Sequence, residues 1–339
     1  MNWRLKVKQK AYEADPAFYY GSYKMGVFLL GHDIPGQIQY KDIKLLMIKG
    51  TFMTSPQTLL KAWNLHARKE LGQNFLKEPH MAERIVDRAD LASDDVVLEI
   101  GAGLGVLTVA AARKAGRVIA VEKDRQLVPL LRVELQVHGF THVRVCEEDI
   151  LSLPLDQLDE TQNRPLVVIG NLPYNISSQV VVKLIKERRW VDRAVLMFQK
   201  ELAERLCAGP GTKVYGRLSV ILQYCADLTP LFDVRATQFH PRPKVDSAVL
   251  EIRFKSSIDR PVDDEQLFTR VVQAAFGQRR KTLRNALSAG LLPLDAAAAV
   301  SVLEASNIDP RRRAETLSVD EFVTLSNQVG LRLGQEYQA

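Results

Sequence analysis

Five apolar runs alternate with helical segments between residues 80 and 255, and this alternation limits the possible folds more than any other feature. The runs occupy residues 95–100, 117–122, 142–149, 164–173 and 193–199. They are short and rich in aliphatic and β-branched residues, whereas the segments 81–91, 106–115 and 125–139 have helical spacing. Strands that alternate with helices build right-handed βαβ units. The sequence therefore predicts an α/β fold whose parallel sheet has helices on both faces.

The pattern changes along the rest of the chain. Strand-like runs at residues 219–234 and 247–254 predict an antiparallel edge of the sheet. Helical spacing then dominates residues 264–290, 295–307 and 318–330, after the polar linker "KSSIDRPVDD". We therefore expect a sheet domain over 66–258 and a small helical domain over 259–339. Residues 1–65 have no sustained period, so we expect an extension that is poorly structured or partly dispensable, with Met53 as a more natural start.

Composition excludes some classes of protein. The 339 residues carry a formal charge of +6, which is compatible with a polyanionic partner but does not require one. The three cysteines, Cys146, Cys207 and Cys225, lie too far apart for a zinc motif or a disulfide framework. The apolar run Met25–Leu30 is far shorter than the roughly 20 residues that cross a bilayer. We expect a reduced cytoplasmic protein without a metal, a membrane segment or a secretory signal.

A glycine-rich turn follows the first strand. "LEIGAGLGVLT" places Gly101, Gly103 and Gly105 between a strand and a helix. Glycine is required where a turn takes positive φ or where the backbone approaches a ligand closely. A tight turn without a ligand is the alternative. Two acidic residues argue against this alternative. Glu122 ends the next strand, where an acid holds ribose hydroxyls in nucleotide-binding folds, and Asp149 ends the third strand.

The same turn distinguishes between nucleoside cofactors. The dinucleotide fingerprint GxGxxG needs a glycine where this chain has Val106, and no GxxxxGK[ST] loop is present. Glu99, two residues before the first glycine, would repel a pyrophosphate but would attract the sulfonium and ammonium groups of S-adenosylmethionine. We therefore predict a Rossmann-like methyltransferase sheet that binds S-adenosylmethionine.

The fourth strand ends in an unusual sequence, "VVIGNLPYNISS". Methyl transfer to an exocyclic amine of a base needs hydrogen-bond acceptors that pull the nitrogen toward tetrahedral geometry. The side-chain carbonyl of Asn171 and a backbone carbonyl near Pro173 could accept these bonds. Leu172, which precedes the proline, is biased toward extended backbone, and Tyr174 offers a face for base stacking. The alternative is an ordinary turn with Tyr174 as a core aromatic residue. We favour the methylation site because it follows a parallel strand at the same edge as the glycine turn.

These motifs together resemble those of the small-subunit ribosomal RNA adenine N6-dimethyltransferases. The resemblance runs from about Leu71 to the C-terminal helices. It rests on "LGQNFL", "EIGAGLGVLT", "NLPYNISS", "PGTKVYGRLSV", "FHPRPKVDSAV" and "FGQRRKTLRNAL", which occur in this order. It implies a class I S-adenosylmethionine-dependent methyltransferase. This enzyme would dimethylate N6 of two adjacent adenines in the loop of the 3′-terminal hairpin of 16S rRNA.

The resemblance also implies roles for individual residues. Asn74 and Leu76 would belong to the segment that closes over the cofactor. Gly101 would contact its methionine part, Glu122 its ribose and Asp149 its adenine, and Asn171 would belong to the cofactor site as well as to the target-base site. The target adenine would lie between two sets of residues, Asn171 and Tyr174 on one side and Phe239 on the other, although core packing is the alternative for Phe239.

Several basic residues are expected to contact RNA phosphates. "FGQRRKTLRN" places Arg280 and Arg284 one helical turn apart, with Arg279 and Lys281 beside them. Two more cations follow Phe239, namely Arg242 and Lys244. A solvated charged face is the alternative, and it is the better interpretation of the run Arg311–Arg313.

Two other functions stay open at this point. One is a large-subunit rRNA dimethylase of the macrolide-resistance type, which shares the fold and the catalytic motif. The other is a ribosome-assembly factor whose binding role outweighs catalysis. Neither the order of methylation nor the oligomeric state follows from the sequence, although we expect a monomer.

Overall fold

The computed structural model describes residues 55–158, 164–278 and 280–336. Residues 1–54 of the predicted extension over residues 1–65 therefore lie outside the described residues, and so does Arg279. Residues 56–62, inside the predicted N-terminal extension, form helix α2. Ser55 caps this helix through its side chain, and Leu59 and Leu60 are buried against the rest of the protein. The folded chain thus begins before residue 66.

The predicted α/β sheet is confirmed. Its strands are β2 (Val96–Ile100), β3 (Arg117–Glu122), β4 (Val143–Glu147), β5 (Leu166–Asn171), β6 (Val191–Gln199), β7 (Ala226–Val234) and β9 (Ser247–Phe254). Their spatial order is β4-β3-β2-β5-β6-β9-β7. The first five of these strands pair in parallel, whereas β9 runs antiparallel to both β6 and β7. A separate small ladder pairs β1 (Phe75–Leu76) with β8 (Phe239–His240).

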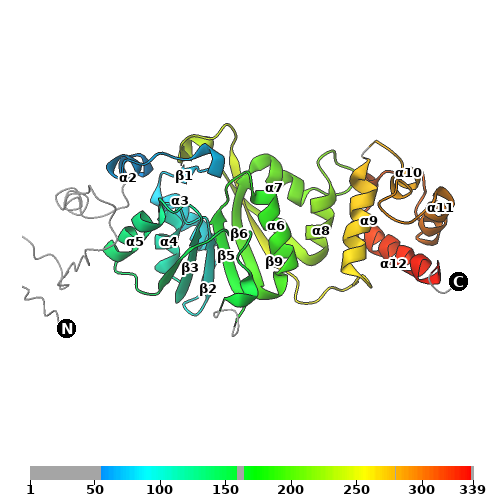
Figure 1. Cartoon of the computed structure of the whole chain (residues 1–339), viewed down its shortest axis with the longest axis horizontal. Helices are drawn as coiled ribbons and strands as arrows, with labels where there is room; N and C mark the ends of the chain where they lie inside the picture. Colours follow the sequence, from blue (N-terminus) through cyan, green and yellow to red (C-terminus); the bar gives the residue numbers. More distant parts are fainter. Residues whose placement is uncertain (1–54, 159–163, 279, 337–339) are drawn as a thin grey trace, which may run out of the picture. The chain divides into compact units, whose positions relative to one another are not determined.

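Helices cover both faces of the sheet, as the alternating pattern predicted (Figure 1). The helices between strands are α3 (Pro79–Arg88), α4 (Val106–Ala112), α5 (Val128–Val137), α6 (Ser177–Lys186), α7 (Lys200–Cys207) and α8 (Arg217–Cys225). Side chains of β2 and β5 alternate between two apolar clusters because successive residues point to opposite faces. Leu98 and Val168 belong to the cluster with α6, α7 and α8, whereas Val97 and Val167 belong to the cluster with α3 and α4.

Helices alone follow β9 in the described part of the chain. The α-helices are α9 (Glu265–Gly277), α10 (Leu283–Leu287), α11 (Ala296–Ala305) and α12 (Val319–Glu336). Short 3-10 turns elsewhere are η2 (Lys69–Leu71), η3 (Leu155–Gln157), η5 (Arg188–Trp190), η6 (Ala236–Gln238) and η7 (Ala314–Thr316). Asp264 and Asp295 cap α9 and α11 through their side chains.

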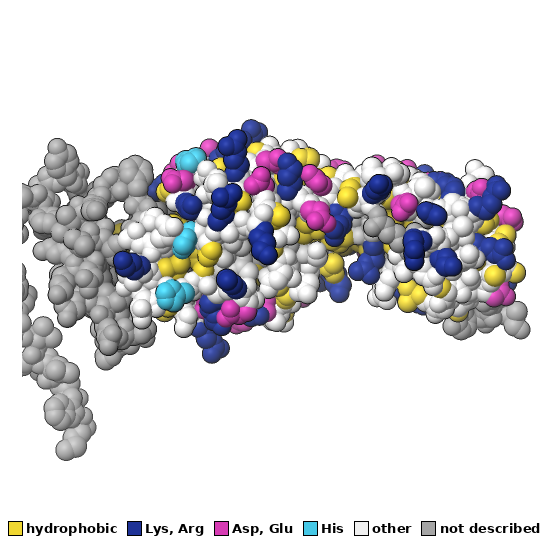
Figure 2. All heavy atoms as spheres, turned by 90° about the horizontal axis from the view of Figure 1, so that it is seen from above, with side chains coloured by type: hydrophobic (Ala, Val, Ile, Leu, Met, Phe, Trp, Pro, Cys, Tyr) yellow, Lys and Arg dark blue, Asp and Glu magenta, His cyan; other side chains and the backbone are white. Residues whose placement is uncertain are grey.

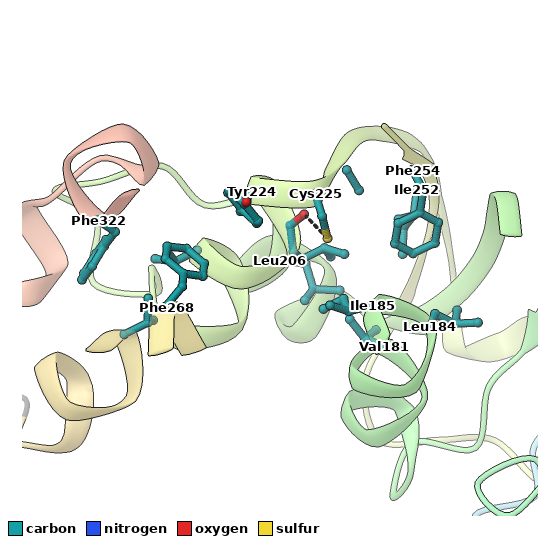
Figure 3. Packing of buried hydrophobic residues seen from close by; sticks show 14 of the residues in the cluster. Val181, Leu184, Ile185, Leu206, Tyr224, Cys225, Ile252, Phe254, Phe268 and Phe322 are labelled. Carbon is teal, nitrogen blue, oxygen red and sulfur yellow. Dashed lines mark hydrogen bonds between the residues drawn. The ribbon is translucent and has the colours of Figure 1, made fainter. Parts of the chain in front are cut away.

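The core of the sheet continues into these helices (Figure 3). Tyr224 of α8 packs on Phe268 of α9 with ring centroids 4.7 Å apart, and its hydroxyl accepts the backbone N–H of Val262 at 3.0 Å. Phe276 of α9 stacks on Phe322 of α12 at 5.8 Å. The domain boundaries at 65/66 and 258/259 stay predictions, since one apolar cluster spans the second of them.

Two predicted elements were wrong in detail. Residues 219–225, expected as a strand, form most of α8, because their buried face packs between α7 and α9 rather than in the sheet. Residues 264–290, expected as one helix, are split at Gly277 into α9 and α10. The first N–H groups of α10 are satisfied by another segment, since Leu283 donates to the Arg312 carbonyl and Arg284 to the Pro310 carbonyl. Arg280 therefore precedes the helix that carries Arg284.

No helix in the described ranges is long and apolar enough to cross a membrane.

Candidate active site

A pocket lies at the carboxyl ends of β2, β3 and β5 and is also lined by residues of α2 and of the segment that leads to β1. The predicted residues that line it are Asn74, Leu76, Glu99, Gly101, Gly103, Glu122, Asp149, Asn171, Leu172, Pro173 and Tyr174. Parallel strands bring their carboxyl ends to the same edge of a sheet, which is why residues so distant in sequence meet here. Gly105 does not line the pocket but forms the N-terminal boundary of α4.

The glycine turn has the backbone that its sequence predicted. Gly101, Gly103 and Gly105 have φ of 74°, 56° and 86°, in the left-handed region where a Cβ atom is unfavourable. Space is also limiting, because a Cβ atom on Gly105 would lie 2.7 Å from the Leu131 side chain. The N–H groups of Gly101 and Ala102 both donate to the Val121 carbonyl, which ties the turn to the end of β3.

Glu122 is buried at the end of β3 and holds the turn from the other side. Its two carboxylate oxygens accept the backbone N–H groups of Gly103 and Asp124, each at 2.7 Å. Burial raises the pKa of Glu122, although these backbone hydrogen bonds oppose the shift. A carboxylate oxygen has two lone pairs, so each oxygen can still accept a ligand hydroxyl.

Glu99 is fully buried in the middle of the pocket wall. Burial raises its pKa to about 8, Thr108 opposes the shift, and the charge of Glu122 adds to it. Its Oε2 atom has no hydrogen-bond partner among the described residues. An unpaired buried carboxyl group is costly unless a donor or a cation reaches it.

Asp149 lies two residues beyond the end of β4. One carboxylate oxygen accepts from the Lys123 ammonium at 2.6 Å, and the other accepts the Leu151 N–H at 3.0 Å. Partial burial alone would raise the pKa of Asp149, but these hydrogen bonds and the Lys123 charge lower it. The carboxylate is therefore ionised and held at the rim of the pocket.

Residues 68–76 form a cover over the pocket, held by hydrogen bonds that the sequence did not reveal. The buried Asp124 accepts from the Gln73 amide at 2.7 Å and from Arg68 at 3.4 Å. Asn74 turns back to donate to the Gly72 carbonyl at 3.1 Å. In the sequence, Asp124 is marked as a possible site residue only by its position two residues after Glu122.

Asn171 is oriented by this cover. Its side-chain nitrogen donates to the Asn74 carbonyl at 2.7 Å, so its carbonyl oxygen is the end left to accept a bond. The Pro173 carbonyl already accepts the Ile176 N–H at 3.1 Å and the Ser177 hydroxyl at 2.9 Å. The Leu172 carbonyl receives no hydrogen bond from the described residues, which makes it the better second acceptor near Pro173.

Tyr174 is half-buried and anchored at the far end of its ring. Its hydroxyl lies 2.7 Å from the Oγ atom of Ser247, a buried residue at the start of β9. Burial raises the pKa of Tyr174, the Ser247 bond opposes this, and the Asp246 charge adds to it. Ser247 follows "FHPRPKVD" in the sequence but gave no signal of its own, because the contact joins residues 73 positions apart.

Phe239 is not brought to the pocket. Its side chain is 0% exposed and belongs to the apolar cluster with Leu76, Met197 and Val249. Its partner across the β1–β8 ladder is Leu76, which does line the pocket. In this structure Phe239 therefore has the core-packing role that was the alternative interpretation.

The predicted RNA-contacting cations that the structure describes are exposed and lie in two places. Arg242 and Lys244 lie in the loop between β8 and β9, and Arg280, Lys281 and Arg284 lie around the start of α10. Figure 2 shows Lys and Arg side chains on one face over both the sheet region and the C-terminal helices, with acidic side chains among them.

The pocket fits S-adenosylmethionine in the chemistry of its donors and acceptors. A cationic group would satisfy the unpaired Glu99 oxygen, ribose hydroxyls would match the acceptors of Glu122, and an adenine amino group would match Asp149. The described lining residues include two lysines, Lys77 and Lys123, and Lys123 is paired with Asp149.

Comparison with known proteins places the chain in a family. The ribosomal RNA adenine dimethylase model matches residues 64–328. A ribosomal RNA small subunit methyltransferase A of Desulforapulum autotrophicum is 47% identical, with 84% of this chain and 99% of that protein covered. The protein of the same name in Alkaliphilus metalliredigens is 42% identical, with 81% and 96% covered.

Solved structures agree on the fold. A dimethyladenosine transferase from Plasmodium falciparum has a TM-score of 0.65 at 28% identity, over 76% of this chain and 98% of that one. The 23S rRNA methyltransferase ErmE has a TM-score of 0.59 at 23% identity, over 76% of this chain and all of that one. This chain belongs to the ribosomal RNA adenine dimethylase family and is an S-adenosylmethionine-dependent methyltransferase.

Proposed function

We propose that this enzyme dimethylates N6 of two adjacent adenines in the loop of the 3′-terminal hairpin of 16S rRNA. The observation that carries the proposal is the position of Asn171–Tyr174. This segment ends β5 and opens onto the same pocket as Glu99 and Glu122. An amine-methylating motif and a site for a cationic nucleoside thus share one pocket.

Asn171 and Leu172 set the geometry of the target amine. The Asn171 side-chain oxygen and the Leu172 backbone carbonyl accept its two N–H bonds, which directs the nitrogen lone pair away from the base plane. The bound S-adenosylmethionine supplies an electrophilic methyl group and retains the bonding electrons on sulfur. One N–H proton then passes to water, so the step needs no strong general base in the protein.

Two features help the target adenine to enter the site, namely its position in an RNA loop and the ring of Tyr174. Base flipping costs less in a loop than in a duplex, and a flipped base can stack on the exposed part of the Tyr174 ring. A contact between the base and Phe239 would require movement of the β1–β8 ladder, because Phe239 is fully buried.

The remaining pocket residues bind the cofactor in this proposal. Glu122 accepts from the ribose hydroxyls, Asp149 from the adenine amino group, and Glu99 faces the cationic end beside Gly101 and Gly103. Asn74 and Leu76 cover the pocket, and Asn171 joins this cover to the target-base side.

The exposed cations bind the RNA backbone in this proposal. Arg242 and Lys244 contact phosphates next to the flipped base, and Arg280, Lys281 and Arg284 contact a more distant part of the RNA, together with Arg279. Replacement of Arg280 and Arg284 by Gln should make the salt dependence of RNA binding less steep. The negative slope of the logarithm of the binding constant against the logarithm of the salt concentration should shrink in magnitude by about two. The pair Arg125→Gln and Arg132→Gln removes the same charge elsewhere, and an equal effect of both pairs would contradict a specific role.

The small subunit is the preferred target because the relatives at 40–47% identity carry that name, whereas the ErmE likeness concerns the fold alone. In this proposal the protein acts as a monomer in the cytoplasm on the small subunit or its precursor.

The test is transfer of tritium from labelled S-adenosylmethionine to under-methylated small subunits, with large subunits assayed in parallel. We expect dimethyladenosine from small subunits, and primer extension should stop at two adjacent adenines near the 3′ end. Label confined to large subunits, or monomethyladenosine as the end product, would overturn the proposal.

A further inference from the structure

We infer that Ser247 is a positioning residue for methyl transfer, which holds the ring of Tyr174 in place through its hydroxyl and joins it to the loop 241–246. This inference rests on the proposed function, since it assigns a role in the target-base site proposed above.

The contact is anchored in the seven-stranded sheet of the described residues. Ser247 is the first residue of β9 and has partners on both sides, Gln199 of β6 and Val234 of β7. Its side chain is 0% exposed, and its Oγ atom lies 2.7 Å from the Tyr174 hydroxyl. A strand that is paired on both sides therefore fixes one end of the hydrogen bond.

Tyr174 needs such an anchor because it lies beyond the end of its own strand. β5 ends at Asn171, and Tyr174 falls in the turn before α6. Its ring is half-buried, so packing covers only part of it. A hydrogen bond at the hydroxyl fixes the orientation of the ring and leaves its face available for stacking.

Ser247 also ends the loop that carries Arg242 and Lys244. The adjacent Asp246 closes this loop, since its carboxylate accepts the Ala236 N–H at 2.8 Å and its carbonyl accepts the Lys200 N–H at 3.0 Å. The loop that is proposed to hold the RNA backbone and the ring that is proposed to hold the base thus meet at one serine hydroxyl.

The test compares three variants in single-turnover methylation of small subunits at saturating cofactor. Ser247→Ala and Tyr174→Phe each remove one hydroxyl of the pair, and the double variant removes both. We expect each single variant to slow methyl transfer about 3- to 10-fold, as for loss of one hydrogen bond. The affinity for S-adenosylmethionine should not change. The double variant should be no slower than either single variant, because the second substitution removes nothing further.

The position of the ring can be read without activity. In NMR spectra of protein with labelled tyrosine rings, Tyr174→Phe identifies the Tyr174 signals. Ser247→Ala should shift these signals and accelerate flipping of the ring, whereas Ser247→Thr, which keeps a hydroxyl, should restore both the signals and the rate. Unchanged Tyr174 signals in Ser247→Ala, or multiplicative losses of rate in the double variant, would overturn the inference.

A buried serine elsewhere controls for simple destabilisation. Ser306, the C-cap residue of α11, is 8% exposed, and its hydroxyl donates to the Val302 carbonyl at 2.6 Å. Ser306→Ala should lower Tm without affecting the Tyr174 signals, and a slowing of methyl transfer that merely followed Tm in both serine variants would also contradict the inference. Failure of the wild-type protein to methylate either subunit would instead refute the proposed function and leave the ring measurement valid.

Discussion

The two halves of the pocket are held in different ways. In the cofactor half, Glu122 and the glycine turn are fixed by backbone N–H groups and carbonyls at the ends of β2 and β3. In the target-base half, Asn171 is fixed by the cover at Asn74, and Tyr174 is fixed by Ser247 on a distant strand. The first half is local in sequence, whereas the second depends on contacts between segments far apart.

This difference suggests that the two halves of the pocket have different roles. A half that is fixed by backbone can bind the same cofactor in every cycle with little rearrangement. A half that is fixed by the cover and by β9 can respond to what occupies the pocket, because the residues that shield the cofactor also orient the acceptor of the target amine. Substitutions in the two halves should therefore separate catalysis from cofactor binding.

The largest effect is expected for Asn171→Ala. Loss of the side-chain acceptor should slow single-turnover methyl transfer about 100-fold or more, as for removal of a preorganised polar group from an active site. Affinity for S-adenosylmethionine, measured by calorimetry, should change only a few-fold, because the cofactor acceptors Glu122 and Asp149 keep their own hydrogen-bond partners in this variant.

Asn327→Ala is the matched control for Asn171→Ala. Asn327 lies in α12, and its side-chain oxygen accepts the Asp263 N–H at 3.1 Å. Its loss should affect stability and leave the transfer rate unchanged. If Asn171→Ala instead reduced cofactor affinity as strongly as it reduced rate, the two halves would not be separable.

A smaller and opposite effect is expected for Glu122→Ala. This change removes the ribose acceptor and also leaves the Gly103 and Asp124 N–H groups without their partner. Affinity for S-adenosylmethionine should fall about 10- to 100-fold, as for loss of hydrogen bonds to a charged group. The transfer rate at saturating cofactor should fall much less.

Glu147→Gln tests whether any acid at this edge would have the same effect. Glu147 ends β4, is exposed and pairs with Arg125. Calorimetry should show wild-type affinity for this variant. Equal affinity in Glu122→Ala and wild type would show that the ribose is held elsewhere.

The same contrast explains how far the sequence could predict this molecule. The sheet, the positive φ of the three glycines and the meeting of Glu122 with Asn171 followed from local patterns, because strand order and strand polarity place them at one edge. The Ser247 bond and the Asp124 contacts with the cover could not be predicted, because no short motif encodes a pairing across 50 or more positions.

Tertiary contacts also overrode two local patterns. The apolar periodicity of residues 264–290 is that of one helix, but the carbonyls of Pro310 and Arg312 satisfy the N–H groups of a new helix start and divide it. Phe239 lies in a motif that suggested a base contact, yet it is fully buried in an apolar cluster with Leu76 and Val249, and its contact with the base stays a prediction. Both outcomes depend on segments distant in the sequence.

The smallest effect concerns the pH dependence of the cofactor half. Burial raises the pKa of Glu99 from 4.5 to about 8, so the folded protein keeps a proton there that the unfolded chain releases near pH 4.5. The folded state therefore binds more protons between these values, and the free energy of unfolding falls as pH rises through this window. Glu99→Gln cannot titrate, so its Tm should exceed that of the wild type by a margin that grows between pH 6 and pH 8.5, on the order of 5 °C.

Affinity for the cofactor should rise with pH, whereas the free energy of unfolding falls. This opposite pH dependence distinguishes a cofactor-binding Glu99 from an acid with a purely structural role. A cation beside Glu99 favours the ionised carboxylate, so wild-type affinity for S-adenosylmethionine should rise from pH 6 to pH 8 and binding should release a proton. Calorimetry in buffers of different ionisation enthalpy measures that release. In Glu99→Gln both the rise and the released proton should be lost, whereas Glu147→Gln, at an exposed position of the same edge outside the pocket lining, should behave as wild type. Parallel pH profiles for Glu99→Gln and wild type would mean that the cationic end of the cofactor lies away from Glu99, and that the buried carboxyl group serves only the packing of the turn.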